Sequence, residues 1–277
     1  MIFVIGGRGR LGQAINASYK EDNPISVDRA IYQSWWAKGT QDDVSRFFEP
    51  WANSGGTVFV TAGILDPRIS QEDHLRVNYL LPKHIIEGAT KLGINVVTFG
   101  TVMESLLANK NPYIQSKAAL GRHVSDISAF NPRVAHLRVH TLYGLGRPSS
   151  FMFLGQVFHA LMNQTVFEMT QGKQLREYHH IDDEVQAIRT LVKLGANGVI
   201  DLNHGKPVTL NELASFIFNA FNAKKLLRIG ALPEPKEENY STVFDCPDLL
   251  RAITFREALP AVVNYLTERF LAVQDFL

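Results

Sequence analysis

The sequence predicts an α/β fold in which a doubly wound parallel sheet carries a smaller, sequence-interleaved C-terminal lobe. Two observations carry this prediction. Over the first half of the chain, strand-length apolar runs alternate with helix-length amphipathic patterns, which is typical of parallel sheets built from βαβ units. After residue 147 the alternation stops, and a helix pattern rich in Phe and Met follows over 149–162.

The first predicted strand, at 2–5, runs directly into a glycine-rich turn and a helix. In a Rossmann-type sheet, Gly6 permits the tight turn, Gly9 lets the backbone approach a pyrophosphate, and Gly12 lets the helix pack close to the strand. Arg10 and Leu11 stand at the start of the helix, whose N–H groups and dipole favour phosphate oxygens. We therefore expect a dinucleotide to bind at this turn.

An acidic residue follows the second short apolar run. Asp28 comes after Ile25-Ser26-Val27, about where an acid accepts hydrogen bonds from an adenosine ribose, and this favours NAD. Arg29, together with Arg8 and Arg10 in the turn, leaves NADP open, because a guanidinium pairs well with a 2′-phosphate. NAD is slightly preferred. Asp28 could also be a simple turn residue.

The same alternation continues along the first half of the chain. Further strands are expected at 58–61, 96–99 and 136–139, and helices at 11–19, 44–51, 74–92 and 114–130. In such sheets the crossover helices cover both faces, and ligands bind beyond the carboxyl ends of the strands.

The chain then leaves the sheet and returns to it. We expect a dinucleotide-binding domain at 1–147, rejoined by about 178–204, where a helix precedes a strand at 198–202. A substrate-binding lobe is expected at 148–177 and 205–277. Its Phe151-Met152-Phe153 run is more typical of a core or a dimer surface than of a cofactor site.

The residues that could carry chemistry are Tyr113 and Lys117. Four residues apart on a predicted helix, they share one face, and a nearby ammonium lowers the pKa of a phenol. Such a tyrosine exchanges a proton with an alcohol or ketone near neutral pH. The same spacing recurs at Tyr79 and Lys83, but Pro82 disturbs the backbone there unless it lies in a first helical turn.

A threonine hydroxyl is expected beside this pair. The predicted strand at 96–99 leads to Gly100-Thr101, at the sheet edge where ligands bind. Thr101 could hydrogen-bond a substrate oxygen while Tyr113 protonates or deprotonates it. Thr98 is the alternative, and either hydroxyl could simply satisfy backbone groups at the strand end.

Five motifs follow one another in a specific order: Gly6-x-x-Gly9-x-x-Gly12, Thr61-Ala62-Gly63 after a strand, His74-Leu75-Arg76-Val77-Asn78, Thr101, and Tyr113-x-x-x-Lys117. Their order and spacing resemble an extended short-chain dehydrogenase/reductase of the NAD-dependent epimerase/dehydratase type. The resemblance implies that the first three motifs bind the cofactor, with Asn78 supporting the lysine side of the site. It also implies that Tyr113 is the acid/base, that Lys117 tunes it and binds the nicotinamide ribose, and that Thr101 positions the reacting oxygen.

The resemblance continues into the second lobe. The segment 172–183 looks like the family segment that closes the substrate lobe onto the main sheet, and by resemblance Arg176 contacts the nucleotide part of a substrate. The segment 207–213 looks like a familiar strand-to-helix entry, with Thr209 as the N-cap. Many relatives form a homodimer through two helices that flank the sheet, and we expect the same here.

The chain also departs from this resemblance at three places. Val102 and Met103 stand where sugar dehydratases would place Asp and Glu, which argues against dehydration, although Glu104 lies only one residue further on. Acidic residues dominate the stretch near 231–236, where many members have an Arg that reaches the substrate pyrophosphate. His140-Thr141 replaces a Phe-Asn pair.

These residues predict an NAD(P)-dependent oxidoreductase that acts on a sugar carbonyl or alcohol, with a nucleotide-sugar 4-ketoreductase as the first choice. A redox-neutral nucleotide-sugar epimerase uses the same groups and is the alternative. A non-catalytic dinucleotide-binding regulatory protein is a third interpretation, against which the intact Tyr113 and Lys117 argue.

Composition excludes several other classes. The net charge of +1 gives no nucleic-acid footprint, the apolar runs are too short to span a membrane, and no basic segment opens the chain, so we expect a cytoplasmic protein. The single Cys246 forms no internal disulfide. No metal is expected, because the adjacent His179 and His180 point to opposite faces of a predicted strand and no His-x-x-x-His motif accompanies them.

Overall fold

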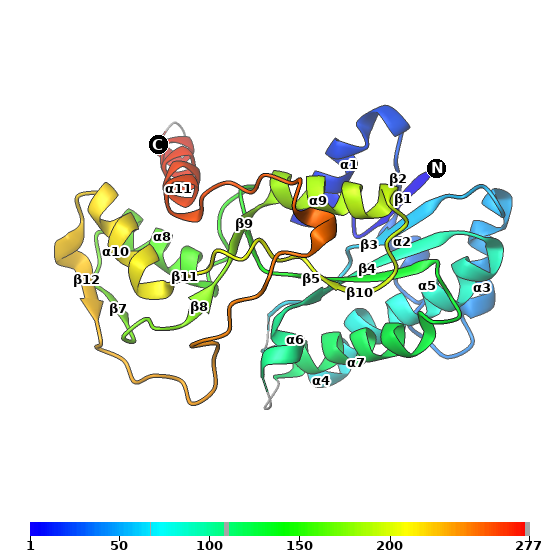
Figure 1. Ribbon diagram of the computed structural model, residues 1–277, viewed down its shortest axis with the longest axis horizontal. Coiled ribbons are helices and arrows are strands. Elements are labelled where there is room, and N and C mark those ends of the chain that lie inside the picture. The colour runs from blue at the N-terminus through cyan, green and yellow to red at the C-terminus, as the bar shows by residue number, and fades with distance from the viewer. Residues whose placement is uncertain (67, 108–110, 275–277) are drawn as a thin grey trace. The chain divides into compact units, whose positions relative to one another are not determined.

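The computed structural model describes residues 1–66, 68–107 and 111–274 and divides the chain into two compact units (Figure 1). The first unit contains Met1–Val139 and Ile188–Leu202, and the second contains His140–Ala187 and Asn203–Leu277. The sequence placed the first change at 147 and the return at about 178–204. In the structure the chain enters the second unit at His140 and returns to the first at Ile188. Both positions differ from those expected because Thr141–Tyr143 and Tyr178–His180 pair with each other in a small sheet of the second unit. The last three residues of the expected lobe, 275–277, lie outside the described residues.

The first unit is built on a six-stranded sheet of order β10-β5-β4-β3-β1-β2. Every neighbouring pair in it is parallel, so the predicted doubly wound Rossmann-type fold is confirmed. The chain runs from β1 outward to β2 and then returns to the other side of β1 to form β3. The ends of β1 and β3 therefore meet at the point where the strand order reverses, which is the ligand side of such sheets. The strands are β1 (Ile2–Ile5), β2 (Ile25–Val27), β3 (Thr57–Val60), β4 (Asn95–Thr101), β5 (Val134–Val139) and β10 (Gly198–Asp201).

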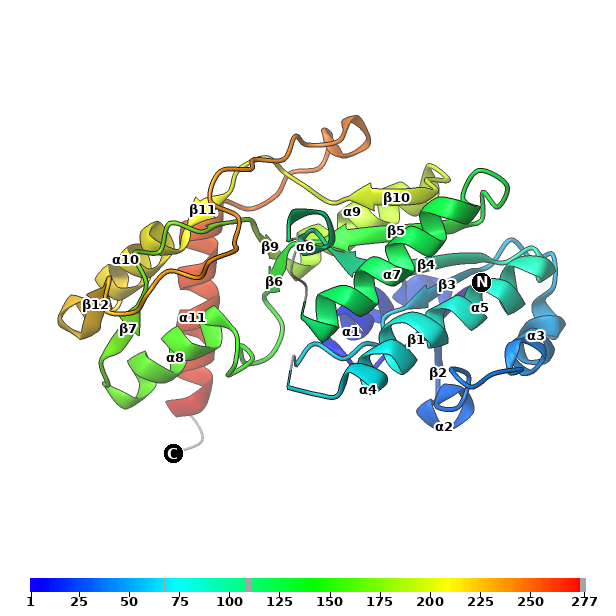
Figure 2. The same cartoon turned by 90° about the horizontal axis from the view of Figure 1, so that it is seen from below.

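Helices cover both faces of this sheet, as expected (Figures 1 and 2). On one face lie α1 (Arg10–Ser18) and the end of α9 (Ile181–Lys193), where Arg189 stacks 4.6 Å from the centre of the Tyr19 ring. The other face is covered by α3 (Gln41–Phe48), α5 (Leu81–Ala89) and α7 (Pro112–Ile127). Shorter helices are α2 (Arg29–Tyr32), α4 (Gln71–Leu75) and α6 (Met103–Leu106).

The helix expected at 74–92 is continuous but contains a π-helical turn. Helix α4 passes into the π turn Arg76–Leu80 and then into α5, and the N–H of Leu81 donates to the carbonyl of Arg76, five residues back. Pro82 lies in the first turn of α5, where its missing N–H costs least. The proline thus marks the change of helical register and does not break the helix.

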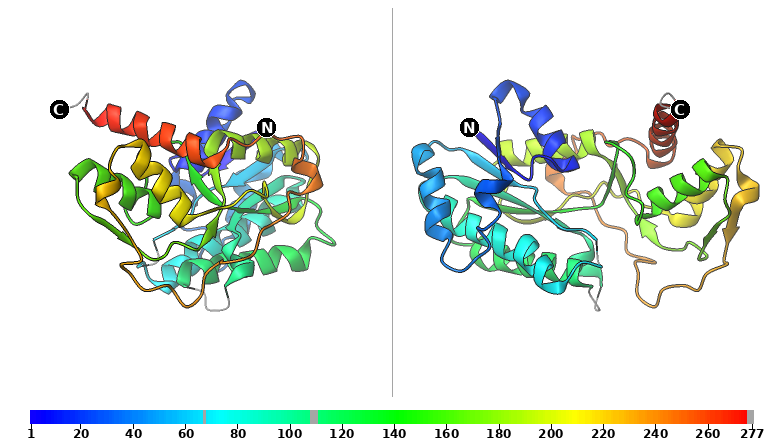
Figure 3. Two further views of the ribbon diagram at one scale, coloured as in Figure 1. Left: turned by 60° about the vertical axis from the view of Figure 1, so that its left-hand side comes forward. Right: turned by 180° about the vertical axis from the view of Figure 1, so that it is seen from behind.

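The second unit, whose helices and short strands can be followed in Figure 3, has its own hydrophobic core. Its helices α8 (Phe153–Asn163), α10 (Leu210–Ala220) and α11 (Ala258–Gln274) pack around large buried side chains such as Phe218 and Leu266. Three pairs of short strands complete it: β6 (Thr141–Tyr143) with β9 (Tyr178–His180), β7 (Phe167–Met169) with β12 (Leu227–Ile229), and β8 (Leu175–Arg176) with β11 (Val208–Thr209).

Two local predictions can be compared with this unit. Thr209 caps α10, and its side chain and that of Glu212 form a reciprocal capping box, which confirms the predicted N-cap. In the Phe151-Met152-Phe153 run, Phe153 packs against the core through the Phe167 ring, whose centre is 5.7 Å away, whereas Phe151 is exposed. Within the described part of the chain, no helix is long and apolar enough to cross a bilayer.

The packing of α1 against β1 predicts a large difference between two glycines of the first turn. A Cβ on Gly12 would lie 2.5 Å from the Gly6 carbonyl oxygen and 2.8 Å from Gly7 Cα, and backbone atoms cannot easily give way. We expect Gly12→Ala to lose about 1–3 kcal/mol of unfolding free energy by overpacking. Urea denaturation followed by circular dichroism measures the loss.

Gly9→Ala is the matched control. Its φ of −71° suits any residue, and an added Cβ would meet only the Gly6 carbonyl oxygen, at 3.3 Å. We expect a change of less than about 0.5 kcal/mol. Equal losses in the two variants would contradict this account of Gly12.

Candidate active site

The glycine turn is fixed by a close approach to the turn after β3. Gly6 has a φ of +87°, and a Cβ there would lie 2.3 Å from the Ala62 nitrogen. The carbonyl of Ile5 accepts hydrogen bonds from the backbone N–H groups of Thr61 and Ala62 and from the Thr61 hydroxyl, at 2.8, 3.0 and 2.9 Å. Gly6 and Gly12 are thus required by the packing of the protein itself, whereas the surroundings of Gly9 leave room for an approaching group.

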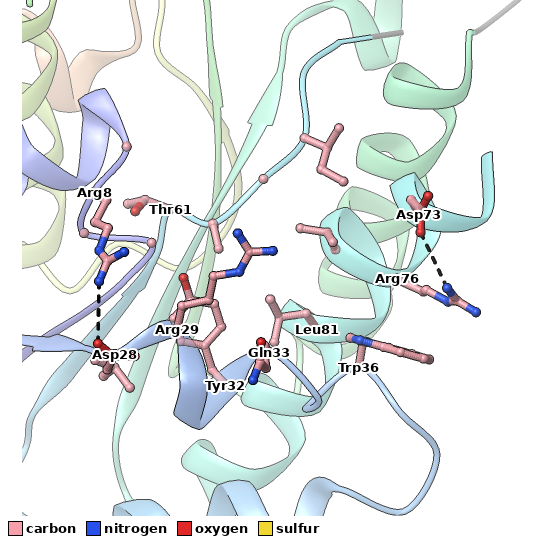
Figure 4. A pocket seen from close by; sticks show the side chains of 18 of the residues that line it. Arg8, Asp28, Arg29, Tyr32, Gln33, Trp36, Thr61, Asp73, Arg76 and Leu81 are labelled. Atoms are coloured by element: carbon pink, nitrogen blue, oxygen red, sulfur yellow. Dashed lines mark hydrogen bonds and ion pairs between the residues drawn. The ribbon is translucent and has the colours of Figure 1, made fainter. Parts of the chain in front are cut away.

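A pocket of 830 Å³ lies at this point of the first unit (Figure 4). This volume is in the range of sites that hold a cofactor or another small molecule. The residues expected at a cofactor and found in its wall are Gly6, Gly9, Asp28, Arg29, Thr61, Ala62 and Gly63. Other expected residues are not among those that line it, namely Arg10, Leu11, Gly12, Asn78, Thr101, Tyr113 and Lys117.

Asp28 takes part in local structure as well as in the pocket. It is the N-cap of α2, where its Oδ1 accepts a hydrogen bond of 2.8 Å from the N–H of Ala30. Its Oδ2 lies 3.7 Å from Arg8 Nη2, and both side chains are mostly exposed. The turn role considered from the sequence is therefore present, and the second carboxylate oxygen still faces the pocket side where Arg8 lies (Figure 4).

Several residues of the pocket wall, among them Trp36, were not predicted from the sequence. Trp36 and Arg76 face each other there, with the guanidinium carbon 4.4 Å from the centre of the indole ring. Arg76 belongs to a motif recognised in the sequence, but nothing in the sequence indicates its partner, because Trp36 follows α2 in an irregular segment. Other wall residues that were not expected are Gly7, Ser26, Val27, Tyr32, Gln33, Ile64, Ile69, Asp73 and Leu81.

Asn78 ties the turn after β3 to helix α7. It lies in the π turn and is fully buried. Its Oδ1 accepts from the N–H of Ile64 at 2.8 Å, and its Nδ2 lies 2.9 Å from the Ile64 carbonyl and 3.1 Å from the Ser116 hydroxyl. A Cβ on Gly63 would lie 3.3 Å from Asn78 Oδ1 and 3.6 Å from Lys117 Nζ. The structure thus brings Gly63, Asn78 and Lys117 together, and Asn78 lies on the lysine side of the site, as we expected from the sequence.

Tyr113 and Lys117 lie one turn apart in α7, but their electrostatics differ from the expectation. Lys117 is buried and donates a 2.7 Å hydrogen bond to the Phe99 carbonyl, and burial lowers its pKa to about 8. Burial raises the pKa of Tyr113 well above 10, and the charge of Glu104 adds to the rise. The sequence predicted a lowered pKa for Tyr113. It is raised because burial disfavours the phenolate and the Glu104 carboxylate adds to this effect, while the Lys117 ammonium is directed at the Phe99 carbonyl.

Of the two candidate threonines, only Thr101 stands at the end of its strand. Thr98 is fully buried, and its hydroxyl is 2.8 Å from His136 Nδ1 and 3.3 Å from the Ala135 carbonyl. Thr101 is the last residue of β4, and its hydroxyl accepts a long hydrogen bond of 3.4 Å from the N–H of Met103. The sheet therefore engages Thr98 structurally, and Thr101 is the hydroxyl at the ligand edge.

Glu104 turns inward under this edge. Its carboxylate accepts from the N–H of Thr101 at 2.7 Å and lies 3.3 Å from His136 Nε2 and 3.2 Å from Arg138 Nε. Burial alone would raise the pKa of Glu104, but His136, Thr101 and Arg138 together lower it below its usual value. The group is therefore ionised at neutral pH, so it could act as a base but not as the acid that protonates a leaving hydroxyl.

Arg176 lies in the second unit, in strand β8. Its guanidinium pairs with Glu238 and also donates to the carbonyl of Leu175 at 2.8 Å, and its side chain is 19 % exposed. The acidic stretch noted in the sequence therefore continues to a residue that neutralises Arg176.

The chain is similar in sequence to a known protein family and to two characterised proteins. The model of the NAD dependent epimerase/dehydratase family matches residues 2–203. CDP-abequose synthase of Salmonella muenchen is 23% identical over 209 residues, which cover 71% of this chain and 70% of that protein. ADP-L-glycero-D-manno-heptose-6-epimerase of Nitratidesulfovibrio vulgaris (strain DP4) is 26% identical over 116 residues, 40% of this chain and 36% of that protein.

Solved structures share the fold over nearly the full length of the chain. UDP-glucose 4-epimerase of Thermotoga maritima with UDP-glucose superposes with a TM-score of 0.81 at 16% identity, covering 99% of both chains. MoeE5 in complex with UDP-glucose and NAD gives a TM-score of 0.77 at 20% identity, again covering 99% of both chains.

The inward position of Glu104 makes a stability prediction. In Glu104→Gln an amide NH₂ would face the donors of His136 and Arg138, which leaves buried donors without an acceptor. We expect the variant to lose about 1–3 kcal/mol of unfolding free energy. The exposed Glu21→Gln should change it by less than about 0.5 kcal/mol. Denaturant titration of both variants measures this, and equal stability would contradict the inferred role of Glu104.

The lowered pKa of Lys117 makes stability depend on pH. The unfolded chain keeps this proton up to the ordinary pKa of 10.5, whereas the folded chain releases it near pH 8. Between these values the unfolded state binds more protons, so a rise in pH stabilises the folded state. Relative to Lys117→Met, we expect the wild type to gain up to about 3 kcal/mol across this window. Unfolding curves at a series of pH values measure the difference, and pH profiles that run parallel would refute it.

Proposed function

This chain belongs to the NAD dependent epimerase/dehydratase family, and from that membership we propose that it is an NAD-dependent oxidoreductase acting on a nucleotide sugar. The first choice is reduction of a sugar ketone, as in a 4-ketoreductase. The observation that carries the proposal is the joining of the glycine turn, Asp28 and Thr61-Ala62-Gly63 in one pocket beside the buried Asn78 and Lys117.

The pocket fits a dinucleotide by its own chemistry. The turn at Gly9 has room for a pyrophosphate, and the N-terminus of α1 follows it directly. Asp28 Oδ2 is an acceptor suited to ribose hydroxyls, which favours NAD. Arg8 and Arg29 in the same wall keep NADP as the alternative, because either guanidinium could pair with a 2′-phosphate.

The catalytic roles are assigned to three side chains. NAD, when bound, supplies or accepts a hydride at nicotinamide C4. Tyr113 exchanges the proton of the reacting oxygen, Thr101 orients that oxygen, and Lys117 provides the positive charge beside them. The raised pKa of Tyr113 keeps the phenol protonated, which is the form that a proton donor to a ketone requires, and positive charge from Lys117 and the bound cofactor would have to lower this pKa for rapid transfer.

A redox-neutral epimerase is the second candidate. The names of the relatives and of several structural neighbours favour it, since they include epimerases for heptose and UDP-sugars. It would use the same three side chains and would keep its cofactor bound through the cycle. Arg176 is proposed to bind the nucleotide part of the substrate in either case. Homodimer formation and a cytoplasmic location stay predictions from the sequence.

The experiment is to denature the purified protein gently and to identify any released dinucleotide by fluorescence and mass spectrometry. Tightly retained NAD would favour the epimerase. Reversible binding of NADH or NADPH, with consumption in the presence of keto-sugar nucleotides, would support the reductase. A protein that binds no dinucleotide would refute both and leave a non-catalytic or unrelated role.

Tyr113→Phe tests the acid/base role. We expect turnover to fall about 10²- to 10⁴-fold while dinucleotide binding is retained. Tyr79→Phe is the matched control, since Tyr79 has the same four-residue spacing from a lysine and should keep full turnover. Steady-state rates and dinucleotide titrations of both variants decide the point. Unchanged turnover in Tyr113→Phe would exclude the role.

A further inference from the structure

The second unit contains a buried set of histidine and glutamate side chains to which the proposed reaction assigns no role. We call it the histidine cluster, and its members are His140, Glu177, His179, Glu184 and His204. None of these side chains is more than 8 % exposed. They come from four places in the sequence: the start of β6, the segment from β8 through β9, the first turn of α9 and the loop after β10.

Three of these residues, His140, Glu177 and His179, each direct a possible metal-ligand atom toward the others. The Nε2 of His179 lies 3.1 Å from Glu177 Oε2, and the Nε2 of His140 lies 3.8 Å from the same oxygen. One ligand atom from each of the three residues lies within 4.8 Å of the others. Zinc bonds of about 2.0–2.1 Å in a tetrahedron set neighbouring donors about 3.3 Å apart. A small shift of these side chains would therefore seat a divalent ion.

The surrounding groups hold these donors in suitable orientations. Glu184 Oε2 accepts a hydrogen bond of 2.7 Å from His179 Nδ1, so Nε2, which faces Glu177, is the nitrogen that would bind an ion after releasing its proton. Glu177 in turn accepts from the backbone N–H groups of His204 and Gly205, at 2.8 and 3.2 Å. A carboxylate behind a histidine is the usual outer support of a metal ligand.

A fourth ligand atom is close by, and aromatic rings pack around the site. Asn203 Oδ1 accepts a hydrogen bond of 2.6 Å from His140 Nε2, and once an ion replaces that proton the two atoms would separate to about 3.3 Å and share it. The Phe255 ring packs 4.9 Å from the His179 ring, and Phe244 packs 5.7 Å from His140, measured between ring centres. Such walls exclude water and strengthen any charge interaction inside them.

The two carboxylates give the cluster a negative charge that either a proton on His179 or a bound cation balances. Glu177 and Glu184 are both buried, and no Lys or Arg of residues 1–66, 68–107 or 111–274 forms an ion pair with either carboxylate. In addition, Glu184 Oε1 and His204 Nε2 are buried and have no hydrogen-bond partner within that part of the chain. Buried carboxylates require either a proton on a neighbouring group or a bound cation.

We propose that the histidine cluster binds one divalent transition-metal ion of the zinc class through His140, Glu177 and His179. Asn203 supplies the fourth position, and Glu184 orients His179. The sequence argument against a metal considered ligand spacing along the chain, but here the donors belong to segments that meet only in the folded unit. This proposal does not rest on the proposed reaction.

The test is metal analysis of the full chain purified without a metal-affinity step. We expect about one equivalent of zinc per chain, or stoichiometric uptake of Zn²⁺ by the protein after chelator treatment. Co²⁺ added in place of Zn²⁺ should give the intense visible bands of a four-coordinate site. Absence of zinc together with failure to take up Zn²⁺ or Co²⁺ would overturn the proposal and leave a protonated histidine as the compensating charge.

Variants locate the ion. His179→Gln should abolish stoichiometric binding, and Glu184→Gln should weaken it about 10- to 100-fold, as expected for an outer support. His159→Gln, at an exposed histidine of α8, is the matched control and should bind normally. Circular dichroism without metal checks folding, and if His179→Gln is unfolded, His140→Gln takes its place. Unchanged affinity in the folded cluster variants would place any bound metal elsewhere and refute the assignment.

Discussion

The candidate site of the first unit depends on the close approach of two backbone turns. The carbonyl at the end of β1 accepts three hydrogen bonds from Thr61 and Ala62, so the turns after β1 and β3 cannot separate without losing all three. This approach leaves no room for a Cβ on Gly6, and the packing of α1 leaves none on Gly12. Because both turns lie where the strand order reverses, one packing constraint of the sheet also shapes the pocket wall.

Buried polar groups extend this constraint from the pocket to helix α7. Asn78 is costly to bury, but its amide is used in full by the turn after β3 and by Ser116. Burial of the Lys117 ammonium is also costly, and the Phe99 carbonyl accepts a hydrogen bond from one of its N–H groups. Each group therefore fixes the relative position of two elements that come from distant parts of the chain. The π turn contributes to this arrangement. Its wider turn rotates side chains around the helix axis relative to a regular α-helix, and Asn78 lies within it.

The sequence was sufficient for the sheet and for residues whose role is local. The alternation of apolar runs gave the strands, and Gly6, Gly12 and Thr209 act on atoms a few residues away or on the adjoining strand. The sequence does not predict the contact of Trp36 with Arg76 or the grouping of His140 with Glu177 and His179. These residues come from segments that are far apart in the chain. The prediction of a lowered pKa for Tyr113 was wrong for a related reason. Its direction is set by burial and by Glu104, and neither follows from a four-residue spacing.

The charges beneath Tyr113 bear on the direction of the proposed chemistry. Glu104 is ionised and raises the pKa of the phenol, so the tyrosine rests as a proton donor. To accept a proton from an alcohol it would need a positive charge that outweighs Glu104 and the cost of burial. Lys117 carries such a charge only below about pH 8, and its ammonium is held by a carbonyl. Burial and Glu104 therefore hold the resting phenol in its protonated form, and rapid proton transfer in either direction would require positive charge from Lys117 and the bound cofactor to lower its pKa.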